Sequence, residues 1–140
     1  MSEREYENDM RKQKCRLGSL IKACRDTLSQ RKLAAQVGLV PSHMKAIEDG
    51  IHAPTPEVYD KLIAILKPGE AMRSEMDTLY MEIRKLPPPD ICAWIVDNPC
   101  MIRAIRRIPD VQLTFEYYDM IDTLFQAIEK EQASKGKKHN

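Results

Sequence analysis

The sequence predicts an all-α fold. Apolar residues recur at helical spacing in successive segments, and glycine or proline stands where most segments end or begin. No alternating strand pattern is longer than a few residues. With 140 residues the chain can bury a core without metals or disulfides, and we expect one domain with a helical extension.

Eight helical segments follow from these patterns. We expect them over residues 11–25, 30–37, 41–49, 56–66, 70–85, 90–96, 99–108 and 111–132. Ser29 is a good N-cap for the second segment, and Gly38 suits the position after its last residue. Pro41 suits the first turn of the third segment. Prolines 87–89 form a stiff hinge before the last three segments.

The composition is 43% hydrophobic and 31% charged, which is ordinary for a soluble protein. No stretch is apolar enough to span a membrane, and the charged start MSEREYENDMRK does not resemble a secretory signal. We therefore expect a cytoplasmic protein with no membrane partner.

The four cysteines, Cys15, Cys24, Cys92 and Cys100, show no C-x-x-C spacing and form no ligand pattern with the histidines. We expect free, buried thiols in a reducing cytosol, with no metal and no cofactor. No Ser-His-Asp set or glycine-rich phosphate loop is present, so we do not expect an enzyme.

Charge is distributed unevenly along the chain. Residues 11–45 contain nine basic residues and one acid, a net charge of +8, whereas residues 68–132 contain seven basic and twelve acidic residues, a net charge of −5. This asymmetry favours a polyanionic partner for the front half. Solvated, lysine-rich helix faces would give the same asymmetry without such a partner.

The stretch LSQRKLAAQVGLVPSHMKAIEDG, residues 28–50, predicts two short helices joined by a tight turn. Gly38 can take the left-handed conformation that ends the first helix, and Ala34 is small where the helices approach. Leu39 and Ile47 can anchor the second helix to the core. This pattern is typical of a helix-turn-helix that presents its second helix to a DNA major groove.

The same stretch resembles the lambda-repressor-like, or Xre, family of helix-turn-helix transcription regulators. The family pattern shows Ser-Gln, Leu-Ala and Gly-Leu pairs and ends on Ile, an acid and Gly. The matching pairs here are Ser29-Gln30, Leu33-Ala34 and Gly38-Leu39, and the match ends at Ile47 and Gly50. The resemblance covers residues 17–66, with two departures: the turn before Leu28 is short, and Val40 replaces the usual Ser or Thr cap.

The resemblance implies a five-helix DNA-binding domain at residues 1–67, with its core at 11–67. Carried over by position, Gln30 would clamp a phosphate, with Arg31 and Lys32 beside it. In the helix of residues 41–49, the groove-facing side chains would be Pro41, Ser42, His43 and Lys45. Alternatively, His43 is a plain surface residue, and Lys45 contacts phosphate without carrying sequence information.

Residues 68–132 are expected to form a helical extension for dimerisation or for binding a partner, and residues 133–140 a disordered basic tail. The last helix carries a heptad-like seam of Tyr118, Ile121, Phe125 and Ile128, which we take as the dimer contact.

We therefore expect a sequence-specific regulator of transcription, a dimeric repressor that binds double-stranded DNA at a palindromic operator. The alternative is the antitoxin of a toxin–antitoxin pair, which would use the same DNA-binding half and bind a toxin through its C-terminal helices. An adaptor that has lost DNA binding fits the +8 segment less well.

Overall fold

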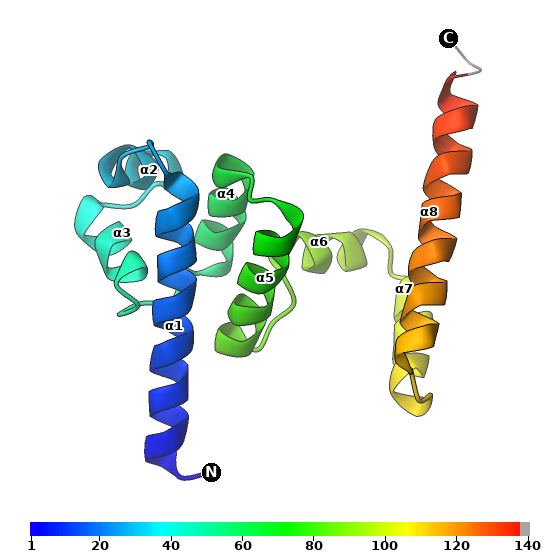
Figure 1. Ribbon diagram of the computed structural model, residues 1–140, viewed down its shortest axis with the longest axis horizontal. Coiled ribbons are helices and arrows are strands. Elements are labelled where there is room, and N and C mark those ends of the chain that lie inside the picture. Colours follow the sequence, from blue (N-terminus) through cyan, green and yellow to red (C-terminus); the bar gives the residue numbers. More distant parts are fainter. Residues whose placement is uncertain (138–140) are drawn as a thin grey trace. The chain divides into compact units, whose positions relative to one another are not determined.

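The computed structural model describes residues 1–137. This part of the chain contains eight α-helices, one short 3-10 helix and no strand, which confirms the all-α prediction (Figure 1). The helices are α1 (Glu3–Arg25), α2 (Gln30–Val37), α3 (Pro41–Glu48), α4 (Pro56–Leu66), α5 (Glu70–Arg84), α6 (Pro89–Asp97), α7 (Met101–Arg107), η1 (Ile108–Asp110) and α8 (Phe115–Lys137). Among them, none is long and apolar enough to cross a membrane.

The chain divides into two compact units, Met1–Asp97 and a second that begins at Asn98. The boundary expected after residue 67 therefore falls inside the first unit. Residues 67–69 only turn the chain, and α5 then packs against α1 and adds Met76 and Tyr80 to the core. Helix α6 contacts α4 and also belongs to this unit.

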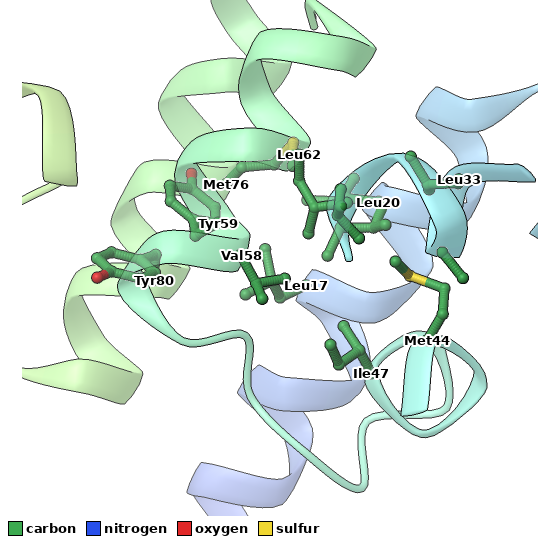
Figure 2. Close-up of a cluster of buried hydrophobic side chains, with 13 residues drawn as sticks. Leu17, Leu20, Leu33, Met44, Ile47, Val58, Tyr59, Leu62, Met76 and Tyr80 are labelled. Carbon is green, nitrogen blue, oxygen red and sulfur yellow. The ribbon is translucent and has the colours of Figure 1, made fainter. Parts of the chain in front are cut away.

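The core of the first unit forms around α1, which contacts α2, α3, α4 and α5. Figure 1 shows α2 and α3 on one side of α1 and α4 and α5 on the other. Figure 2 shows the side chains of these helices meeting in one cluster. The buried apolar residues are Leu17, Leu20, Ile21, Leu33, Ala34, Val37, Met44, Ile47, Val58, Tyr59, Leu62, Met76 and Tyr80.

Helix α1 begins at Glu3, two turns earlier than the apolar pattern indicates. Ser2 accepts a hydrogen bond from the Glu5 backbone N–H, and the Glu5 carboxylate accepts one from the Ser2 backbone N–H. This reciprocal arrangement is a capping box, which stabilises the first turn without tertiary contacts. Residues 3–9 are accordingly helical but exposed.

Two tyrosines join α4 to α5. The rings of Tyr59 and Tyr80 stack with centroids 4.2 Å apart, and both residues are buried (Figure 2). The Tyr59 hydroxyl donates to the Asp77 carboxylate at 2.6 Å, and Arg73 donates to the same carboxylate at 3.1 Å. Burial, together with this hydrogen bond to Asp77, raises the pKa of Tyr59 far above its ordinary value.

We expect the stability of the first unit to fall at alkaline pH because of Tyr59. A tyrosine whose pKa is raised by folding contributes stability that is complete below its unfolded pKa of about 10 and is lost as pH rises above it. Urea unfolding at a series of pH values should show this loss, and Tyr59→Phe should make it smaller. An unchanged alkaline slope in Tyr59→Phe would contradict the assignment.

The second unit contains α7, η1 and α8, and none of its described residues is buried. Helix α8 begins at Phe115 and continues through Lys137, so the expected tail from residue 133 is helical as far as the structure describes it. Residues 138–140 of that expected tail lie outside the described residues.

Candidate nucleic-acid interface

Helices α2 and α3 pack against each other across a short turn at residues 38–40. Gly38 ends α2 with φ 76°, a left-handed conformation that favours glycine, and the Leu39 N–H donates to the Ala34 carbonyl at 2.8 Å. Ser29 caps the start of α2 by accepting from the Lys32 N–H, as predicted. Val40 gives α3 no side-chain cap, and Pro41 fixes its first turn instead.

A buried carboxylate ties together the ends of three helices. Glu48, at the end of α3, has a side chain that is 2% exposed. Its Oε1 accepts from Arg25 Nε at 2.6 Å, and its Oε2 accepts from Gln30 Nε2, also at 2.6 Å. Arg25 also donates to the Leu28 carbonyl at 3.2 Å. The network fixes α3 relative to the end of α1 and the start of α2.

Helix α3 also lies unusually close to α1. A Cβ atom built on Gly18 would lie 2.8 Å from the carbonyl carbon of Glu48, and closer still to the carbonyl oxygens of Ile47 and Glu48. Only glycine leaves room for this backbone approach. Met44 and Ile47 complete the anchoring by pointing into the core (Figure 2).

The opposite side of α3 is exposed and polar. Pro41, Ser42, His43 and Lys45, the predicted groove-facing residues, are all exposed. Ser42 and Lys45 share one helix face because they are three residues apart. Lys45 Nζ donates to Asp49 Oδ2 at 2.6 Å, and this hydrogen bond raises the pKa of Lys45.

His43 is exposed, and its ring contacts the ring of a second histidine. Its ring meets the ring of His52 edge-on, with centroids 5.7 Å apart. The two rings border an open groove of about 490 Å³ that Lys14 and Arg84 also line. Arg84 is held there because it donates to the carbonyls of Ala53 and Pro54 at 2.8 and 2.9 Å.

The first turn of α2 adds positive charge beside α3. Arg31 and Lys32 are exposed and form no ion pair with any described residue. Gln30, predicted to clamp a phosphate, is half-buried and donates one N–H to Glu48. Three of the nine basic residues in 11–45 are paired with carboxylates: Arg16 with Glu75, Arg25 with Glu48 and Lys45 with Asp49.

The thiols are free, but they are less buried than expected. Cys15 and Cys100 are exposed, and Cys24 and Cys92 are half-buried. Burial of Cys24 raises the pKa of its thiol, which lowers its reactivity. Among the described residues, no three His, Cys, Asp or Glu side chains gather as a metal site would require.

The predicted dimer residues, Tyr118, Ile121, Phe125 and Ile128, all lie on α8 and are all exposed. They belong to the second unit.

Comparison with known proteins gave no match to a family model, a curated protein or a solved structure. Sequence reasoning missed Glu48 and Arg25 as a pair, because the pattern of residues 47–50 gives no sign that the acid is buried.

Proposed function

We propose that the chain is a sequence-specific DNA-binding protein in which α3 enters the major groove of double-stranded DNA. It would act as a transcriptional repressor, as a dimer on a palindromic operator. The observation that carries the proposal is the construction of α3, a short helix fixed on one side by Met44, Ile47 and Glu48 and exposed on the other. A rigidly held helix with short polar side chains at its start suits contact with base edges.

The charges beside α3 support the proposal. Arg31 and Lys32 lie in the first turn of α2, where unpaired backbone N–H groups also favour an anion. Gln30 uses one amide N–H for Glu48, which leaves the second N–H for a phosphate oxygen. The negative charge of Glu48 is compensated by Arg25, so it does not repel the phosphates from below α3.

The proposal is tested by selecting bound sequences from a pool of random DNA duplexes with the full chain. We expect enrichment of an inverted repeat whose half-sites are about one helical turn, roughly 34 Å, apart. A promoter that carries the enriched sequence should lose transcription when the protein is added. A selected pool no different from the starting pool would overturn the proposal, because binding through phosphates alone enriches nothing.

Asp49→Asn is expected to tighten DNA binding. The change removes a negative charge from the exposed end of α3 and releases Lys45 from its 2.6 Å ion pair, so that Lys45 can reach a phosphate. We expect affinity for any duplex to rise roughly threefold to tenfold at low salt, with a salt slope steeper by about 1.

The matched control is Asp60→Asn, which makes the same charge change at an exposed position of α4. Fluorescence anisotropy over a salt series measures both variants. If Asp49→Asn binds no more tightly than Asp60→Asn, Lys45 does not lie at the DNA.

A further inference from the structure

Helix α8 carries an apolar face that the other described residues of its own unit leave uncovered. Five of its residues, Tyr118, Ile121, Leu124, Phe125 and Ile128, are between 38% and 59% exposed. Single exposed apolar residues are ordinary, but a continuous row of this size marks an interaction surface. In proteins most helical stability comes from packing of an apolar face, so we expect this face of α8 to pack against a partner.

We propose that this partner is α8 of a second copy of the chain, packed antiparallel about a two-fold axis at the level of residue 123. The proposal deepens the dimeric part of the proposed function. It does not depend on DNA binding.

The spacing of the apolar residues suits such an axis. Tyr118 and Ile128 lie equally far from residue 123, as do Ile121 and Phe125. A two-fold axis there places Tyr118 opposite Ile128 of the second copy and Ile121 opposite Phe125 of the second copy. Every layer of the seam then pairs two large apolar side chains, which is the self-complementarity that a two-fold interface requires.

The charges of α8 favour the antiparallel direction. Residues 116–129 contain four acids and no basic residue, whereas residues 130–137 contain three lysines and one acid. Parallel packing would place the acidic segments side by side, which is unfavourable. Antiparallel packing instead brings the lysine-rich end of each helix to the level of the acidic start of the other, and it also opposes the helix dipoles.

One like-charged approach remains in this arrangement. The two Asp122 side chains come toward each other near the axis, at the exposed edge of the seam. Asp122 accepts a hydrogen bond from Gln126 Nε2 at 3.0 Å, and salt screens charges at an exposed edge. The repulsion between the two Asp122 carboxylates therefore costs little free energy compared with the gain from burying four apolar layers.

The first test is sedimentation equilibrium of the full chain without DNA, so that a failure of DNA binding cannot affect the result. We expect a reversible dimer. Ile121→Asp should raise its dissociation constant roughly 100-fold, because the dimer would bury two unpaired charges. Thr123→Asp makes the same charge change on the far face of the helix and should alter the constant by less than about threefold.

A monomeric wild-type chain would overturn the proposal. So would a dimer that Ile121→Asp leaves intact, because the contact would then lie elsewhere. Thermal unfolding of the first unit should be the same in both variants, which shows that the substitutions act on α8 alone.

The second test determines the direction of packing. Nitroxide labels are attached at Thr123→Cys or at Lys130→Cys, after the four native cysteines are replaced by alanine. Antiparallel packing places both labels at position 123 at the level of the axis, on the far faces of the two helices, so their separation is set by the width of the helix pair alone and is shorter than the separation at position 130. At position 130 the two labels should be about 21 Å apart along the axis, from a rise of about 1.5 Å per residue. Equal distances at the two positions would show parallel packing and contradict the proposal.

Discussion

Replacement of Arg25 by methionine is expected to destabilise the first unit by about 3–5 kcal/mol. Arg25 is the cation that compensates Glu48, whose side chain is 2% exposed. Without it, Glu48 keeps only the hydrogen bond from Gln30, and a buried carboxylate with no cation is costly. A typical domain has a free energy of unfolding of about 5–15 kcal/mol, so a loss of this size is a large fraction of its stability. We therefore expect the urea midpoint to fall markedly.

The double variant Arg25→Met with Glu48→Gln separates the effect of the uncompensated Glu48 charge from the effect of changed side-chain packing. Removing both charges should recover much of the loss, because the remaining amide no longer carries an uncompensated charge. If Arg25→Met alone costs less than about 1 kcal/mol, the pair does not fix α3 in the way we describe. In that case the position of α3 would depend on apolar packing alone.

Replacement of Gly18 by alanine is expected to destabilise the first unit strongly. The new methyl group would lie 2.8 Å from the carbonyl carbon of Glu48 and closer to two backbone oxygens, none of which can rotate away. Helix α1 must then move away from α3. We expect a net loss of about 2 kcal/mol or more, after the gain of about 1 kcal/mol that alanine brings to a helix.

Ser19→Ala is the control for this effect. Ser19 is the neighbouring residue on α1, is exposed, and donates only to the Arg16 carbonyl of its own helix. We expect a change within about 0.5 kcal/mol. Equal stability of Gly18→Ala and Ser19→Ala in urea unfolding would contradict the close approach of α1 and α3. If the approach is real, Gly18→Ala should also weaken DNA binding, since α3 would shift.

Local signals predicted much of the first unit. Ser29, Gly38 and Pro41 mark helix ends by their own backbone and capping chemistry, and the structure places the ends of α2 and the start of α3 where these residues indicate. In α1, Leu17, Leu20 and Ile21 lie at helical spacing in the sequence, and all three are buried in the core. The start of α1 was missed even though Ser2 and Glu5 have the spacing of a capping box.

Features that depend on contacts distant in sequence could not be predicted in this way. Glu48 has a residue type that is usually exposed, and only the approach of Arg25, 23 residues away, makes its burial possible. Tyr59 is buried, and the ring that stacks on it belongs to Tyr80 on the next helix. The break at residues 67–69 predicted a domain boundary, but the return of α5 against α1 is a tertiary contact with no local signal.

In the candidate interface, too, some features follow from local sequence signals and others depend on side-chain contacts. The exposure of Pro41, Ser42, His43 and Lys45 agrees with the helical period and the apolar anchors between them. The pairing of Lys45 with Asp49 and the ring contact of His43 with His52 depend on side-chain conformation, which composition and spacing do not determine. Whether these residues contact DNA stays a prediction.

The most direct test of α3 as the recognition helix is discrimination between a selected duplex and a scrambled one, measured by fluorescence anisotropy at moderate salt. The variant combines Ser42→Ala, His43→Ala and Lys45→Ala, and the control combines Lys61→Ala and Ser74→Ala at exposed positions of α4 and α5. We expect the α3 variant to keep its fold and to bind both duplexes equally, while the control still prefers the selected duplex. An α3 variant that discriminates as well as the wild type would contradict the account, because sequence recognition would then lie outside α3.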